Sequence, residues 1–295
     1  MFRFTKYRLI YFIFSAILIL ASIGVLIIFG LKPGIDFTGG SIMEIEYLNE
    51  RPANQEILKK LADFNLGEVY IQPTEEKGVI LRMKDINEET HQQILKKLGE
   101  VEEKRFESIG PTIGRELKRK TKVVIALALL SMVFYIALAF RRIQRPLRSF
   151  EFGIASVIAL FHDILFPLGV FGILGKFYGV EISIPVITAL LAVLGYSINN
   201  TVVVFDRIRE NLLRRGEGFD EIVDRSLNQT LSRQINTSLT TLFVSLAIFF
   251  FGGETLKYFA LTLILGISAG TYSSIFLAGP LLVAWFNWKT KKNLA

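Results

Sequence analysis

The sequence predicts an α-helical polytopic membrane protein with six transmembrane helices and one small α+β, ferredoxin-like domain outside the membrane. Three observations predict this class. Hydrophobic residues make up 51% of the 295 residues, and the mean hydropathy is +0.44. Six apolar runs are each long enough to cross a hydrocarbon core of about 30 Å, which takes about 20 residues. One polar stretch, at 32–120, alternates strand-like and helix-like patterns.

The first apolar run follows Arg3, Lys6 and Arg8 and therefore resembles a secretory signal sequence. Its apolar part is too long for one, and no small-x-small cleavage site follows it. We predict that residues 1–31 form a short inner N-terminus and an uncleaved first transmembrane helix. All six predicted spans are 9–31, 122–140, 150–174, 183–205, 235–252 and 258–286.

The positive charges predict the orientation of the spans, because Lys and Arg are enriched on the cytoplasmic side of membrane proteins. With the N-terminus inside, the two short outer loops contain only Lys176 and Lys257. Both termini are therefore predicted in the cytoplasm, residues 32–120 outside, spans two to six at 121–286 and a cytoplasmic tail at 287–295. The 16 inner charges are Arg3, Lys6, Arg8, Arg141, Arg142, Arg145, Arg148, Arg207, Arg209, Arg214, Arg215, Arg225, Arg233, Lys289, Lys291 and Lys292.

The composition also excludes several classes of protein. The chain has no cysteine, which excludes a disulfide framework, Cys-ligated metal sites and thiol chemistry. The formal net charge of +7 does not indicate a nucleic-acid surface, because the positive residues are scattered over four separate segments. We expect no metal and no cofactor.

The polar stretch is predicted to form a compact outer domain. Residues 41–48 alternate, with Met43, Ile45 and Tyr47 on one face and Glu44 and Glu46 on the other. The order of elements is β-α-β-β-α-β, which is typical of a ferredoxin-like domain. The predicted strands are 41–48, 68–72, 79–84 and 101–108, and the predicted helices are 52–64 and 87–98.

A cytoplasmic amphipathic segment is predicted at 207–234. Apolar residues recur at helical spacing within it, although the segment is otherwise charged. We expect this segment to lie along the membrane surface.

The spans contain few ionisable side chains, and such residues are functional candidates by default. His162 and Asp163 lie about 13 residues into the third run, roughly 20 Å from its inner end at 1.5 Å per residue. A structural alternative stays open for each: a carboxylate bonded to a neighbouring span for Asp163, and a hydrogen-bonded packing residue for His162. Arg233 lies where basic side chains commonly extend toward the membrane surface.

Gly266 and Gly270 form a G-x-x-x-G pattern, which predicts close helix packing. We further expect Gly266, Gly270 and Ser274 to belong to a lateral face that meets a partner protein. The same residues spell G-x-S-x-G, the pattern of a hydrolase nucleophile elbow, with Ser268 as the serine. The elbow requires a strand, a turn and a helix, whereas this segment reads as continuous helix. A Ser268–His162 hydrolase is therefore disfavoured, and we expect no catalytic residues and no enzymatic activity.

Several motifs together resemble the SecD/SecF family of protein-export membrane proteins, on its SecF side. They include the family positions Asp36, Gly39, Gly40, Asn199, Asp206 and Arg207. The resemblance covers nearly the whole chain, and the motif that closes the fourth span is long and specific. The motifs are GIDFTGG at 34–40, GPTIGREL at 110–117, His162-Asp163, GYSINNTVVVFDRIREN at 195–211 and SLNQTLSR at 226–233.

The resemblance implies one half of an RND-superfamily transporter in the bacterial cytoplasmic (inner) membrane. Such a subunit pairs with SecD as a heterodimer, acts beside the SecYEG channel and uses the proton motive force to assist the export of unfolded polypeptides. YajC and YidC are the further partners that it suggests, along with membrane lipid, and the outer domain becomes periplasmic. An RND-type half-transporter for another substrate stays open as the alternative, as does coupling to sodium ions in place of protons.

The chain departs from the family at one position. The family usually has Asn-Asp-Thr or Asn-Asp-Ser where this chain has Asn199-Asn200-Thr201. The resemblance implies an ion-coupling set of Asp163, Asn200, Arg233 and His162, in which the usual aspartate pairs with the arginine. We expect Asn200 and Arg233 to meet near the inner side of the bundle. Because Asn200 is neutral, it mimics the protonated aspartate.

Overall fold

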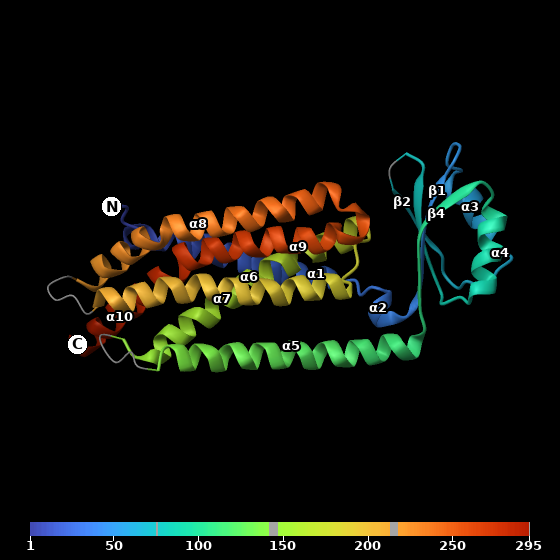
Figure 1. Cartoon of the computed structure of the whole chain (residues 1–295). Coiled ribbons are helices and arrows are strands. Elements are labelled where there is room, and N and C mark those ends of the chain that lie inside the picture. The colour runs from blue at the N-terminus through green and yellow to red at the C-terminus, as the bar shows by residue number, and fades with distance from the viewer. Residues whose placement is uncertain (75, 142–146, 213–217, 295) are drawn as a thin grey trace. The chain divides into compact units, whose positions relative to one another are not determined.

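The computed structural model describes the whole chain except residues 75, 142–146, 213–217 and 295. It contains two compact units (Figure 1). The helical unit comprises Met1–Leu31, Ile125–Val180 and Ile184–Ala295. The second unit, called the outer unit after its predicted location, comprises Lys32–Val124 and Glu181–Ser183. Arg142, Arg145, Arg214 and Arg215, which contribute to the charge bias, lie outside the described residues.

Six helices in the described part of the chain are long and apolar enough to cross a membrane, which confirms the predicted fold class. The sixth of these consists of α9, a π-helical segment η2 and α10 in direct succession. The elements are η1 (Thr5–Tyr7), α1 (Arg8–Phe29), α5 (Pro111–Ala139), α6 (Ser149–Tyr178), α7 (Ile184–Leu212), α8 (Phe219–Phe251), α9 (Gly253–Tyr272), η2 (Ser273–Ala278) and α10 (Gly279–Leu294).

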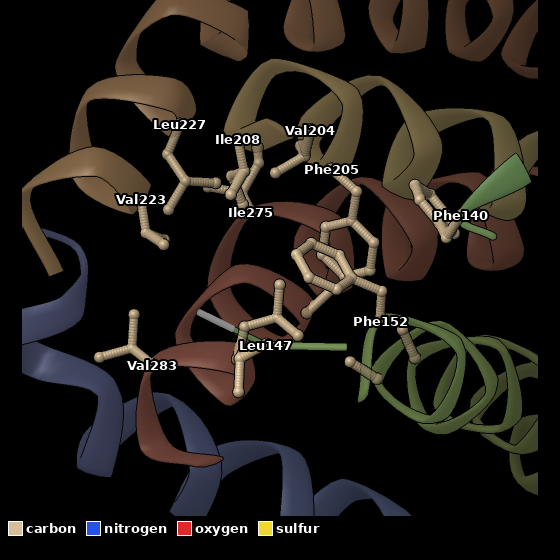
Figure 2. Packing of buried hydrophobic residues seen from close by; sticks show 14 of the residues in the cluster. Phe140, Leu147, Phe152, Val204, Phe205, Ile208, Val223, Leu227, Ile275 and Val283 are labelled. Atoms are coloured by element: carbon tan, nitrogen blue, oxygen red, sulfur yellow. The ribbon is translucent and has the colours of Figure 1, made fainter. Parts of the chain in front are cut away.

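The end of the helical unit at which both chain termini lie has an aromatic and aliphatic core (Figure 1). Figure 2 shows Phe140, Phe152 and Phe205 side by side, and their ring centroids lie 5.2–5.8 Å apart. Val223 and Leu227, from the predicted amphipathic segment, belong to the same core. The predicted segment 207–234 divides between two helices: residues 207–212 end α7 and residues 219–234 begin α8. The 33 residues of α8 span about 50 Å and exceed the hydrocarbon core. The expectation that the segment lies on a membrane surface is therefore wrong, because its apolar side chains pack inside the protein.

Small residues bring α1 and α6 together. A Cβ atom on Gly169 would lie 2.7 Å from Cβ of Ser22, and one on Gly172 would lie 2.8 Å from Val25. In lipid there is no hydrophobic force between helices, so such close approach supplies the van der Waals contact that holds them.

The outer unit confirms the predicted ferredoxin-like order of elements. Its sheet has the strand order β2-β3-β1-β4, with every neighbouring pair antiparallel. Met43, Ile45 and Leu81 of the sheet and Ile57 and Ile94 of the helices are wholly buried in one core. The elements are α2 (Ile35–Thr38), β1 (Gly40–Tyr47), α3 (Asn54–Leu61), β2 (Tyr70–Thr74), β3 (Gly78–Met83), α4 (Glu88–Leu98) and β4 (Val101–Ile109).

The two consecutive glycines before β1 are required by backbone geometry. Gly39 has φ +77° and Gly40 has φ +133°, conformations that residues with a side chain rarely adopt. A Cβ atom on Gly39 would also lie 2.9 Å from Cα of Pro111, at the start of α5. Gly114 faces the same backbone, since its Cβ atom would lie 2.8 Å from the amide nitrogen of Gly39. The glycine pair therefore lets the start of β1 pass directly against the first turn of α5.

We predict that Gly39→Ala destabilises the outer unit more than Gly99→Ala does. Gly99 is a matched control, because it also has a positive φ (+103°) but open space around it. The positive φ costs about 1–2 kcal/mol at either position, and the contact with Pro111 adds to that cost only at Gly39. Proteolysis and hydrogen exchange of the full chain in detergent measure the difference. Equal losses in the two variants would show that the contact with α5 is unimportant.

Candidate functional site

A wholly buried carboxylate lies in the middle of the helical unit. Asp163 on α6 has no exposed surface, and three donors surround it. Ser197 Oγ of α7 donates to Asp163 Oδ2 at 2.5 Å, and Ser273 Oγ of η2 donates to the same oxygen at 2.7 Å. His162 Nδ1 lies 2.9 Å from Oδ1, and it donates to that oxygen when the carboxyl is ionised, because an ionised carboxylate only accepts. The site thus joins the third, fourth and sixth spans at one side chain.

Gly270 allows this approach. A Cβ atom there would lie 3.2 Å from Cβ of Ser197 and 3.5 Å from Oδ2 of Asp163. Gly266, one turn earlier on α9, packs directly against Val193 of α7. Ser274 is buried and donates to Gln234 Oε1 at 2.6 Å. The expected partner-facing role of these three residues is therefore wrong, because they pack within the chain.

His162 is 1% exposed and is held on two sides. Its ring stacks on Tyr272, with ring centroids 5.8 Å apart. The Tyr272 hydroxyl donates to the backbone oxygen of Tyr11 at 3.2 Å, which links the site to α1. The second ring nitrogen, Nε2, is buried and has no hydrogen-bond partner in the described structure. Nδ1 of His162 therefore bonds to Asp163, whereas Nε2 can still form a hydrogen bond.

Two more buried polar groups lie one turn along α7 from Ser197. Asn200 is 3% exposed and Thr201 is 1% exposed. Asn200 Nδ2 and Thr201 Oγ1 both lack hydrogen-bond partners among the described residues. Buried polar groups in native proteins are normally paired with protein or water, so this region has capacity for further hydrogen bonds.

Arg233 does not join this buried group. Its side chain is exposed and lines a polar hollow of about 160 Å³ on α7 and α8, together with Val203, Asp206, Arg207, Glu210, Gln229 and Thr230. The described structure contains no hydrogen bond between Asn200 and Arg233, so the expected meeting is not observed in this conformation. Asn199 is also exposed, on a different face of α7 from Asn200.

The hydrolase alternative fails on geometry. Ser268 is exposed in the middle of the continuous helix α9, with no strand or turn before it. The one histidine in the spans, His162, is bonded to Asp163. Neither the elbow nor a serine–histidine pair is formed.

Among the described residues, the remaining family positions form no hydrogen bond or ion pair with Asp163. Asp36 lies in the short helix α2 of the outer unit, next to Gly39 and Gly40. Near the C-terminal end of α7, Arg207 pairs with Glu210 at 2.7 Å, and Asp206 lies 3.6 Å from Arg209.

The outer unit contains an ion cluster that the sequence did not reveal. Glu181, from the connection between α6 and α7, lies 3.2 Å from Arg82 of β3 and 3.9 Å from Lys32. A parallel bridge between Pro33 and Ile182 runs beside it. Burial raises the pKa of the Glu181 carboxyl, although Arg82 and Lys32 oppose the rise. The local sequence does not indicate that Glu181 forms ion pairs, because its partners Arg82 and Lys32 are far away in the chain.

Comparisons with known proteins agree with this architecture. The family described as "Protein export membrane protein SecD/SecF, C-terminal" matches residues 90–288, and the "SecD/SecF GG Motif" matches residues 24–47. The protein translocase subunit SecF of Thermobaculum terrenum is 44% identical over 96% of this chain and 93% of its own length. SecF of Anaerolinea thermophila is 36% identical over 94% of this chain and 92% of its own length.

Solved structures with a similar fold also come from SecDF proteins. A crystal structure of SecDF from Thermus, described as a translocon-associated membrane protein, superposes with a TM-score of 0.82 at 34% identity. It covers 97% of this chain, whereas this chain spans 39% of that longer one. A second SecDF structure, in a super-membrane-facing form, gives a TM-score of 0.70 at 33% identity, over 99% of this chain and 40% of its own length. The chain therefore belongs to the SecD/SecF family of protein-export membrane proteins, and it is similar to SecF over nearly its whole length.

Proposed function

We propose that this chain is the SecF-type subunit of a protein translocase accessory complex in the bacterial cytoplasmic membrane. It pairs with a SecD subunit and uses the proton motive force to assist polypeptide export, with both termini cytoplasmic and the outer unit periplasmic. SecYEG, YajC and YidC are the further partners that family membership suggests. The observation that carries the ion-coupled part of this proposal is the wholly buried carboxylate of Asp163 among three donors from three spans.

A buried carboxylate can couple proton movement to helix packing. An ionised side chain is costly inside a membrane unless donors surround it. In its ionised form Asp163 accepts from Ser197, Ser273 and His162 at once. In its protonated form it must itself donate one hydrogen bond, so one of those three donors loses its acceptor. Gain or loss of a proton therefore changes which neighbouring helices the side chain holds.

His162 and Asn200 extend this site. The free Nε2 of His162 can pass a proton toward or away from Asp163 through the other nitrogen. Asn200 occupies the position of the usual family aspartate and carries no charge. Asp163 is then the carboxylate that acts in the membrane, and the chain as it stands corresponds to the protonated form of the family site. Arg233 joins Asn200 only after a rearrangement, because its side chain is exposed in the present conformation.

The face that meets SecD is proposed on α7 and α8. Thr188, Ala192, Gly195 and Asn199 form an exposed stripe of small and polar residues at helical spacing on α7. Asn236, Thr237 and Thr240 are exposed on α8. Polar side chains facing lipid are costly, whereas small and polar residues favour helix association. A partner helix that covers this face explains both stripes.

Restoration of the usual family aspartate at position 200 tests the ion-coupling set. We predict that Asn200→Asp strengthens proton-dependent export, because it restores a second titratable carboxylate, and that Arg233→Ala abolishes that gain. Proton flux and precursor release are measured in vesicles reconstituted with the SecD partner and SecYEG. Full and equal coupling with Asn200 and with Asp at this position would show that the site is not a switch. A variant that drives ion flux without any effect on precursor release would favour the alternative half-transporter.

The partner face has its own test. We predict that Gly195→Leu lowers recovery of the SecD complex about tenfold, which corresponds to about 1.4 kcal/mol. Gly24→Leu on α1 is the matched control, because both glycines lie in spans with no atom within 4 Å of an added Cβ. Co-purification from membranes measures the loss, and comparable insertion of both variants is checked first. Equal recovery of the two variants would place the interface elsewhere.

A further inference from the structure

The sixth span changes its helical geometry beside Asp163. Residues Ser273–Ala278 form the π-helical segment η2 between α9 and α10. π-helical turns are rare, and they occur frequently at functional sites. The ordinary α-helix is the default, so contacts around η2 must favour the wider turn.

Two neighbouring serines tie the start of η2 to two other helices. Ser273 and Ser274 are both wholly buried. Ser273 donates to Asp163 on α6 at 2.7 Å, and Ser274 donates to Gln234 on α8 at 2.6 Å. These hydroxyls hold the wider turn in place between α6 and α8.

The far side of η2 is attached at the inner end of the bundle. A Cβ atom on Gly279, the first residue of α10, would lie 3.4 Å from Leu227 and 3.5 Å from Val223 of α8. Further along α10, Lys289 Nζ lies 2.7 Å from Glu151 Oε1, in the first turn of α6. The Glu151 side chain is only 6% exposed, so α10 supplies the countercharge of a buried carboxylate.

The two attachments depend on each other through helix geometry. Each residue of an α-helix turns by about 100° and rises by 1.5 Å. A π-helical turn accommodates one residue more than an α-helical turn. Relaxation of η2 to α-helix would therefore rotate α10 relative to α9 by on the order of 100°. Ser273 and Lys289 could then no longer face Asp163 and Glu151 together.

We propose that η2 is a register switch in the sixth span. The Ser273–Asp163 hydrogen bond holds the π-helical form, and its loss lets η2 relax, which turns Gly279 away from Val223 and Lys289 away from Glu151. A change at Asp163 thereby reaches the inner end of α10. This inference rests on the proposed role of Asp163. Among the described residues, the groups that face Asp163 are the imidazole of His162 from α6 and the hydroxyls of Ser197 from α7 and Ser273 from η2.

Cross-linking in the native cysteine-free chain tests the switch directly. Val223→Cys with Gly279→Cys reports on the start of α10, and Ser238→Cys with Thr271→Cys reports on α8 and α9 before the switch, where the native hydroxyls lie 2.6 Å apart. Each pair is oxidised in membranes that contain the SecD complex. The backgrounds are the native chain, Asp163→Asn, Ser273→Ala and the control Ser156→Ala, a buried α6 serine that bonds only to its own helix.

We expect Asp163→Asn and Ser273→Ala to slow the 223–279 cross-link at least fivefold and to leave the 238–271 cross-link unchanged. Ser156→Ala should change neither. Equal rates of the 223–279 cross-link in all backgrounds would overturn the proposal. Loss of both cross-links would also overturn it, because the effect would then be a general loosening of the bundle.

Deletion of Leu277 provides a second, independent test of the register switch. It removes the extra residue, so an α-helical turn then keeps α10 in its present register. In this background Asp163→Asn should no longer slow the 223–279 cross-link, and a persistent effect would contradict the switch.

The cross-linking rates report on structure alone and can be measured without transport. If Asp163→Asn abolishes export while the cross-links stay unchanged, the switch fails and the proposed function stands. If the cross-link changes while export persists, the proposed function fails.

Discussion

The structure of the helical unit depends on one constraint: a carboxylate side chain lies inside the helix bundle with no exposed surface. Asp163 is wholly buried, and its oxygens are satisfied by a serine from α7, a serine from η2 and the adjacent histidine. Those donors can reach it only because Gly270 leaves room beside Ser197. The hydrogen bonds of this one side chain thus join three spans. A change in its charge therefore alters the bonds that hold these spans together.

Different interactions hold the two units together. The outer unit buries an ordinary apolar core between its sheet and its helices, and it uses glycine where β1 must pass against α5. The helical unit cannot rely on the hydrophobic effect between helices, so it uses close contacts at Gly169, Gly172 and Gly266 and interhelical hydrogen bonds of the buried hydroxyls of Ser238 and Ser274. Unpaired polar atoms remain near Asp163, on His162, Asn200 and Thr201, and they mark where a rearrangement can form new bonds.

The sequence predicted the six spans, the order of elements in the outer unit and the place of Asp163 within an apolar span, because hydropathy and periodicity are local properties. It could not predict that Ser197 and Ser273 converge on Asp163, since this depends on helix register and on a π-helical turn that no local pattern marks. The same limit explains the error at Gly266 and Gly270: spacing predicts that two helices approach closely but not which ones. The expected pairing of Asn200 with Arg233 followed from the family resemblance and from depth along the helices, whereas the rotation of each helix decides where a side chain points.

We propose that the charge state of Asp163 drives the function of this chain. The most direct measurement is proton-driven release of a precursor polypeptide from vesicles that contain the chain, its SecD partner and SecYEG, with native Asp163 or with Asp163→Asn. Asp206→Asn, an exposed carboxylate on α7, serves as the control. The account predicts that Asp163→Asn reduces proton-dependent release to the level seen without a gradient, while Asp206→Asn retains it. Full proton-dependent release by an intact Asp163→Asn complex would contradict the account.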